Sequence, residues 1–446
     1  MAEAATAARP RALPPPPAAL RWTVVAVFSV ATFFSCYLFD CIGPLARLLS
    51  VQLGFSNADI GLLQAVCSLP NLVMVLIGGI IIDRIGERRS AIIFASLCLA
   101  GAGLTALSPR LGVMVAGRLL FGLGSGSLSV AVNTAIAKWF RGVKVSFVFG
   151  VSLTIARLGS LASQTSPAWA KWAYVGWRGP LLLALAGGGL CLVFAVLYGV
   201  LEGRAARRYD LGSPGAGGPM IWGDLLKFSR SYWLITLLCI TFYAGIYPFQ
   251  TFAQKFFIEA HGASASRAAL LVGIPTAIAM VTTPLFGLLV DRIGHRARCM
   301  ALGTALLVPS YLLMAYSHLD LVVPVAMMGV AFSLVPAVMW PSVMLIIPQA
   351  KLGKAFGLMS LIQSLGLTGF NFLIGWANDA QRASEANPAG YRLGMWLFSG
   401  SVLLGLGFAI LLWLRERGPS GHGLESASGR RRALPGPGDP AAPLVP

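Results

Sequence analysis

The sequence predicts an all-α membrane protein with twelve transmembrane helices in two pseudo-symmetric six-helix halves. Three observations lead to this fold class. Hydrophobic residues make up 57% of the 446 residues and charged residues only 11%, whereas a soluble domain carries about 25% charged residues. Long apolar runs alternate with short charged segments. A ten-residue pattern that starts at Gly79 recurs at Gly287, 208 residues later, which is typical of an internally duplicated membrane protein.

The apolar runs are long enough to cross a bilayer. A transmembrane helix needs about 20 predominantly apolar residues, and twelve runs in the chain meet this length. The predicted spans are 23–46, 58–82, 90–107, 112–138, 143–170, 179–201, 231–257, 267–290, 299–317, 321–347, 355–378 and 392–414.

The polar segments divide the chain into two halves and two tails. Residues 1–21 and 416–446 are rich in Pro and polar residues, so we expect disordered cytoplasmic tails. Residues 22–201 form the predicted N-terminal half, 202–229 a cytoplasmic linker, and 230–415 the C-terminal half. No cleavable signal peptide is expected, because the first apolar run leads directly into further spans.

The basic residues predict the orientation in the membrane. With twelve spans, 24 of the 34 Lys and Arg residues fall on the side that carries both termini, eight on the opposite side and two inside spans. Because cytoplasmic loops are enriched in Lys and Arg, both termini are predicted to be cytoplasmic. We expect a multi-pass protein of the cytoplasmic (plasma) membrane. The net charge of +18 therefore reflects topology, and no nucleic-acid binding is predicted.

The composition gives little support for an enzyme. The seven cysteines lie in or at the ends of apolar runs without metal-ligand spacing, and the four histidines fall in loops or the tail. No zinc site, Ser-His-Asp set or phosphate-binding loop is apparent. We expect no enzyme activity, no cofactor, no metal and no obligatory protein partner. The expected partners are a small-molecule substrate, the lipid bilayer and, if transport is coupled, protons.

The repeated pattern lies after a span in each half. It reads Gly-x-x-x-Asp-Arg-x-Gly in both copies, and Gly is expected to allow close backbone approach while Asp, Arg and Gly form a tight turn. The pattern resembles the loop between helices 2 and 3 of the major facilitator superfamily, and its echo between helices 8 and 9; Glu87 stands where that family often has a basic residue. The resemblance implies cytoplasmic latches, with each Asp at a helix N-terminus. The predicted latch residues are Gly79, Asp83, Arg84, Gly86 and Arg88 in the first copy and Gly287, Asp291, Arg292 and Gly294 in the second.

Three charged residues lie well inside the predicted spans, away from their ends. Charges in hydrocarbon are costly and usually functional. Arg157 lies about 21 Å along its helix at 1.5 Å per residue, just beyond mid-depth, and either binds substrate or fixes packing. Arg118 belongs to a helix-4 pattern that serves packing, coupling or both. Asp40 is the predicted proton carrier if transport is proton-driven, because burial raises the pKa of a carboxyl group; uniport is the alternative.

Neutral polar and aromatic residues supply further candidates. We expect substrate contacts from residues inside or beside broken spans, although each of them could instead serve helix packing. Gly122, Gly124 and Gly126 either allow close helix packing or leave volume for substrate. The neutral substrate-binding candidates are Asn133, Tyr243, Tyr247, Trp340 and Gln363.

A narrower resemblance rests on several short runs in both halves. They include Ser68-Leu-Pro-Asn71, Ala156-Arg-Leu-Gly-Ser160, Trp340-Pro341 and Leu352-Gly-Lys-Ala-Phe-Gly357. These runs resemble the lysosomal dipeptide uniporter subfamily and its prokaryotic relatives. The resemblance implies that Arg157 takes the substrate carboxylate, since Arg can bind a carboxylate bidentately. The family Glu that would suit an amino terminus is Gly126 here, and Asp40 is a candidate substitute.

Together these features predict an alternating-access transporter of a small carboxylate-bearing solute, such as a dipeptide, an amino-acid derivative or an organic acid. A proton-coupled organic-anion or drug exporter is the alternative within transport. A transport-dead membrane scaffold or sensor is the alternative of another class.

Overall fold

The computed structural model describes residues 16–140, 145–209, 228–348, 351–419 and 421–426, together with Pro14 and Leu211. Helices dominate these residues, and no β-strand occurs among them. Ten of the described helices are long and apolar enough to cross a membrane. The predicted span 58–82 corresponds to α3 and the first part of α4, and the span 143–170 to α6. The prediction of an all-α membrane protein is confirmed, and the helices are consistent with twelve spans.

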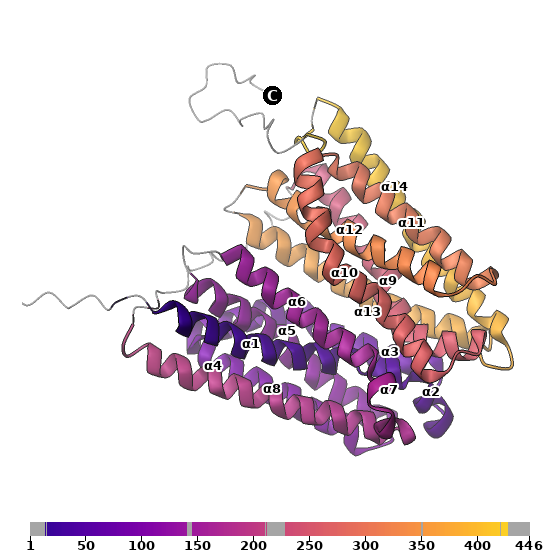
Figure 1. The fold of residues 1–446 in the computed structure, drawn as a ribbon, viewed down its shortest axis with the longest axis horizontal. Helices are drawn as coiled ribbons and strands as arrows, with labels where there is room; N and C mark the ends of the chain where they lie inside the picture. Colours follow the sequence, from indigo (N-terminus) through magenta and orange to yellow (C-terminus); the bar gives the residue numbers. More distant parts are fainter. Residues whose placement is uncertain are drawn as a thin grey trace, which may run out of the picture. The chain divides into compact units, whose positions relative to one another are not determined.

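The chain forms two compact units (Figure 1). Unit 1 comprises Met1–Cys41, Pro70–Ser163 and Arg178–Gly217, and unit 2 comprises Ile42–Leu69, Gln164–Trp177 and Gly218–Pro446. The helices of unit 1 are α1 (Ala18–Asp40), α4 (Asn71–Leu107), α5 (Leu111–Trp139), α6 (Val145–Gln164), which ends one residue beyond it, and α8 (Arg178–Ala205).

Unit 2 contains the helices of the C-terminal half and short segments from the N-terminal half. The N-terminal segments are α2 (Ile42–Leu53), α3 (Asn57–Ser68), α7 (Ser166–Trp169) and the 3-10 helix η1 (Lys171–Val175). The remaining helices are α9 (Arg230–His261), α10 (Ala265–Ile293), α11 (Arg296–Tyr316), α12 (Val322–Ile346), α13 (Leu352–Ala380), the 3-10 helix η4 (Pro388–Tyr391) and α14 (Arg392–Arg417).

Glycines set the close packing inside unit 1. Helix α4 lies along α5 and α8, and α1 lies along α8. A Cβ atom at Gly124 of α5 would lie 2.5 Å from the carbonyl oxygen of Phe94 on α4, and Gly101 and Gly117 face each other's helices equally closely. Small residues of this kind let membrane helices approach backbone to backbone. Of the two predicted uses of Gly124, packing is the one that the structure shows.

In unit 2, α3 packs against α13, and α2 packs against α9. Gly61 of α3 meets the backbone of Asn371, and Gly375 of α13 meets the backbone of Asn57 and Ala58, so neither position has room for a side chain. Residues 42–69 therefore pack on C-terminal helices, although the predicted boundary assigns them to the N-terminal half.

The tails and the linker lie mainly outside the described residues. Where they are described, the structure differs from the predicted disorder at both ends. Helix α1 begins at Ala18, α14 continues to Arg417, and residues 421–426 make defined contacts with the rest of unit 2.

Candidate functional site

Arg118 of α5 caps the end of α1. Its side chain is buried, and its two terminal nitrogens donate to the carbonyl oxygens of Leu38 and Phe39, each at 2.8 Å. The last carbonyls of a helix have no partner within it, so this guanidinium helps to satisfy the end of α1, where the Cys41 thiol also donates to the Leu38 carbonyl at 3.1 Å. Its charge also lies 5.4 Å from the ring centre of Phe121. These contacts give Arg118 a packing role beside Asp40.

Asp40 is the last residue of α1, and it lies close to Arg118 and to the side chain of Ser160 on α6. Helix α6 approaches α1 so closely that a Cβ atom at Gly159 would collide with the carbonyl oxygen of Phe33. Arg157 is partly buried on α6, and residues three apart on a helix share a face. The three embedded charges thus belong to one region of unit 1, on or beside the α1–α6 contact.

The subfamily that the sequence resembles has a Glu where this chain has Gly126. The space beside Gly126 is filled by a neighbouring side chain. A Cβ atom at Gly126 would overlap the side-chain oxygen of Asn71. That oxygen is buried and has no hydrogen-bond partner among the described residues. A side chain at position 126 therefore requires Asn71 to move, and Gly126, like Gly124, serves close packing here.

Several candidates in unit 2 form an aromatic cluster. The indole nitrogen of Trp340 donates to the hydroxyl of Tyr243 at 3.1 Å, and the rings of Tyr243 and Tyr247 stack with centres 5.5 Å apart. Gln363 lies beside Cys239, which precedes Tyr243 by one helical turn on α9. The amide oxygen of Gln363 and the sulfur of Cys239 are 3.9 Å apart. Asn133, the remaining neutral candidate, lies on α5 of unit 1 with an exposed side chain.

The first turn (residues 83–89) breaks α4. Gly86 has φ 81° and ψ 154°, a conformation that is strained for residues other than glycine. Glu87 is buried, whereas Arg84 and Arg88 are exposed. The Glu87 carboxylate accepts a hydrogen bond from Lys138 of α5, which also donates to Glu202 of α8 at 2.6 Å. The side chain of Asp83 lies outside the described set.

The second turn (residues 291–297) has two successive residues at positive φ, Gly294 and His295, whereas the first departs from helical angles at Gly86. Gly294 has φ 73° and ψ −134°, and it ends α10. Here the basic residue is buried: Arg296 donates to the carboxylate of Asp291 at 2.5 Å, and the Asp291 side chain is exposed. Arg292 is also exposed. The predicted tight glycine turn therefore forms in both copies.

The expected close approach at the first glycine of each copy is wrong. Nothing described lies within 4 Å of a Cβ atom built at Gly79 or at Gly287. Both positions are helical and half-buried, so among the described residues the requirement for glycine in the pattern falls on Gly86 and Gly294, which have positive φ.

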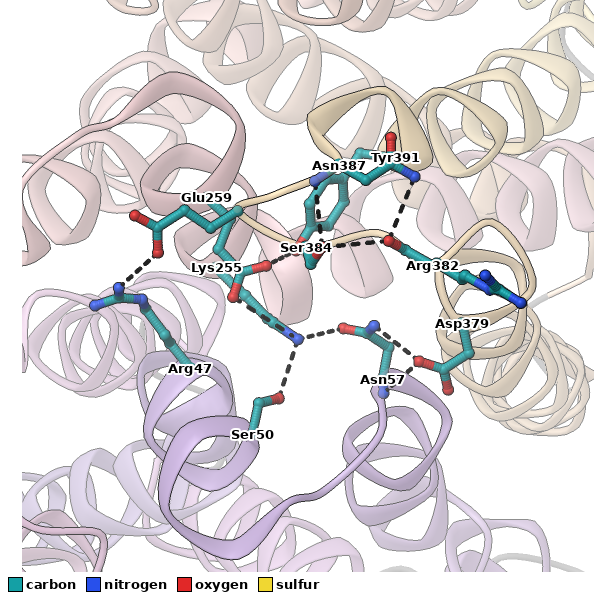
Figure 2. A network of polar contacts seen from close by, with 11 residues as sticks. Arg47, Ser50, Asn57, Lys255, Glu259, Asp379, Arg382, Ser384, Asn387 and Tyr391 are labelled. Carbon is teal, nitrogen blue, oxygen red and sulfur yellow. Dashed lines mark hydrogen bonds and ion pairs between the residues drawn. The ribbon is translucent and has the colours of Figure 1, made fainter.

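Figure 2 shows a polar network in unit 2 that was not anticipated. Lys255 of α9 is 5% exposed, and its ammonium donates to Ser50 of α2 at 3.0 Å and to the side-chain oxygen of Asn57 at 2.7 Å. Asp379 of α13 accepts from the backbone N–H groups of Asn57 at 2.8 Å and Ala58 at 2.7 Å. A carboxylate from α13 thus caps the first turn of α3, where the helix dipole favours a negative charge.

Further contacts surround this network. The Tyr391 hydroxyl donates to Glu259 at 2.5 Å, Glu259 lies 4.0 Å from Lys255, and an exposed ion pair joins Arg47 to Glu385 at 3.1 Å. Each of these residues is of a type that is common near helix ends, so the sequence alone does not indicate that they form a network. By the predicted topology it lies on the side opposite the two termini.

Comparison with known proteins agrees with this architecture. The family model described as Major Facilitator Superfamily matches residues 28–369 and 251–440. The lysosomal dipeptide transporter MFSD1 of Homo sapiens is 30% identical over 434 residues, which cover 94% of this chain and 92% of that protein.

Two solved structures share the fold. A point mutant of the nucleoside transporter NupG superposes with a TM-score of 0.72 at 13% identity, covering 87% of this chain and 100% of that one. A bacterial homologue of the human lysosomal transporter Spinster, inward-facing and unoccupied, gives a TM-score of 0.73 at 16% identity, covering 90% and 97%. The chain is a multi-pass membrane protein that belongs to the Major Facilitator Superfamily, a family of membrane transporters and not of enzymes.

Proposed function

We propose that this protein transports a small carboxylate-bearing solute by alternating access, and that Arg157 binds the carboxylate of the substrate. The candidate solutes are dipeptides, amino-acid derivatives and organic acids. The relative that aligns over 94% of the chain is named a dipeptide transporter, and a dipeptide carries a carboxylate.

The observation that supports this proposal most directly is that Arg118, one of the two embedded arginines, is bound to the backbone of α1. Arg118 is buried against the end of α1 and donates to two backbone carbonyls, so it is poorly suited to bind a substrate anion. This leaves Arg157 in the role that the resemblance assigns to it. A guanidinium inside a membrane protein needs a partner, water or a ligand, and its planar donors match a carboxylate.

The same proposal gives roles to the other candidates. The cluster of Tyr243, Tyr247 and Trp340 offers aromatic surface with hydroxyl and indole groups for the body of the solute, and Asn133 and Gln363 offer amide contacts. Asp40 is the proposed proton carrier or partner of a substrate ammonium group. Because Gly126 and Asn71 supply no carboxylate, a substrate without an ammonium group is compatible with this site.

For gating, we propose that the two turns latch the cytoplasmic side and that the network around Asp379 closes the opposite side. Both termini are proposed to lie in the cytoplasm, with the protein in the plasma membrane. Opening toward the opposite side then requires α3 to leave the Asp379 carboxylate and Lys255 to lose Asn57.

The test is uptake of labelled dipeptides and organic acids into proteoliposomes that contain the purified protein. Arg157→Ala should reduce uptake at least tenfold, and Arg157→Lys should also impair it because Lys lacks the planar fork. Amidation of the substrate carboxylate should have the same effect on the parent protein. Arg110→Lys is the matched control, since Arg110 is exposed at the start of α5.

Normal uptake by Arg157→Lys together with normal uptake of the amidated solute would refute the carboxylate site. Active export of organic anions or drugs against a proton gradient would instead favour the exporter. Failure of every solute to bind or move would favour a scaffold or sensor.

A further inference from the structure

The chain folds back after α14 and contacts unit 2 again. We call residues 421–426 the strap. The fully buried carboxylate of Glu416, on the last turn of α14, accepts from the backbone N–H groups of His422 at 2.7 Å and Leu424 at 3.3 Å. It also accepts from the hydroxyl of Ser231 at the start of α9, at 2.9 Å. Leu424 is completely buried, so the strap has both a polar and an apolar anchor.

The strap then reaches the second turn. The backbone N–H of Arg296 donates to the carbonyl of Leu424 at 3.0 Å. One carboxylate oxygen of Glu425 accepts from the backbone N–H groups of Ala297 at 3.1 Å and Arg298 at 3.3 Å, and the other lies 3.2 Å from the Arg298 guanidinium. The first N–H groups of a helix have no partner inside it, so the strap satisfies those of α11.

The two turns differ in the source of this carboxylate. In the first turn the residue after the glycine is Glu87, whose carboxylate accepts a hydrogen bond from Lys138. In the second turn the residue after the glycine is His295, which brings no carboxylate. Its ring nitrogen instead lies 3.3 Å from Glu425. The strap therefore brings a carboxylate from outside the repeat to the start of α11.

We propose that the strap is a conformational brace for the second turn: Glu425 caps the N-terminus of α11, and release of the strap loosens the start of α11 while leaving the first turn unchanged. The brace joins the ends of α9, α11 and α14 through Ser231, Glu425 and Glu416. The strap, which follows the last span, is thereby connected directly to one of the two turns. This inference does not depend on the transported solute.

The test is hydrogen–deuterium exchange of the full-length protein in detergent or nanodiscs. Glu425→Ala should speed the exchange of the amides of residues 296–298 by roughly tenfold, since it removes the side-chain acceptor of two of these N–H groups. The amides of residues 84–90 should exchange as in the parent. Glu425→Gln, which keeps the shape and one acceptor oxygen, should give an intermediate increase and guards against a folding defect.

Asp320→Ala is the matched control, because Asp320 caps the start of α12 through the N–H of Val322 at 3.0 Å and is remote in sequence from the second turn. It should leave residues 296–298 unchanged. Unchanged exchange of residues 296–298 in Glu425→Ala, or an equal increase at residues 84–90, would overturn the proposal.

Discussion

The two turns of the internal repeat share a glycine at positive φ and differ in the residue that follows it and in their charges. Both use a glycine at positive φ, 81° at Gly86 and 73° at Gly294. The first turn buries an acidic residue, Glu87, and exposes Arg88, whereas the second exposes His295 and buries Arg296. The repetition has therefore kept the glycine that makes the connection, whereas the charge that is buried beside it differs between the two copies.

The largest expected effect concerns the buried charges of the first turn. Lys138→Met should leave Glu87 and Glu202 buried without their shared cation, and removal of one partner from a buried ion pair costs about 3–5 kcal/mol. We expect a clear fall in the melting temperature of the purified protein. Arg89→Ala, an exposed change in the same turn, is the control.

Adding Glu87→Gln and Glu202→Gln to Lys138→Met should recover part of the lost stability, because no uncompensated charge then remains. If Lys138→Met melts with the parent protein, the buried cluster does not hold the first turn and the contrast between the turns loses its energetic basis.

An intermediate and equal effect is expected at the two glycines. Gly86→Ala and Gly294→Ala should each cost about 1–3 kcal/mol, because alanine is strained at these backbone angles. Gly79→Ala is the control: it lies within a helix with open space around it, and should be neutral or stabilise by about 0.5–1 kcal/mol. Thermal unfolding in detergent measures all three. Unequal losses of stability at Gly86 and Gly294 would show that a glycine at positive φ is more strictly required in one turn than in the other.

The smallest effect on stability is expected from Asp291→Ala. Asp291 pairs with Arg296, but its side chain is 60% exposed, so the loss should be below about 1 kcal/mol. If the turns act as latches, uptake should nevertheless fall in Asp291→Ala and in Asp83→Ala while membrane insertion stays normal. Uptake at the parent rate in both variants would contradict the latch prediction. A loss of uptake in only one variant would show that the two turns also differ in function.

Much of the fold followed from the sequence, because the hydrocarbon core of a bilayer imposes long apolar spans and duplication repeats their order. The glycine turns were also predictable, since Gly86 and Gly294 stand in matching positions. The repeated pattern itself shows that Glu87 is unusual. It does not show the partners of Glu87, because Lys138 and Glu202 come from two other helices and only the packing of α4 on α5 and α8 joins them.

For the candidate site, too, the sequence predicts which residues are involved but not which groups they contact. The sequence identified Asp40, Arg118 and Arg157 as embedded charges, and it proposed the aromatic residues Tyr243, Tyr247 and Trp340, which the structure brings together. It did not reveal that Arg118 binds backbone carbonyls, because carbonyls are identical at every residue. The network of Lys255 and Asp379 escaped for a related reason: it depends on which helix ends meet.

The cap that Asp379 places on α3 has a consequence for tolerance to mutation. On the α3 side, two of the three donors are backbone N–H groups, those of Asn57 and Ala58, which every residue except proline possesses. A saturation library should therefore accept many residues at position 58 and few at position 379. A substitution on α13 can remove the whole contact, whereas a substitution on α3 removes at most the donors of one residue.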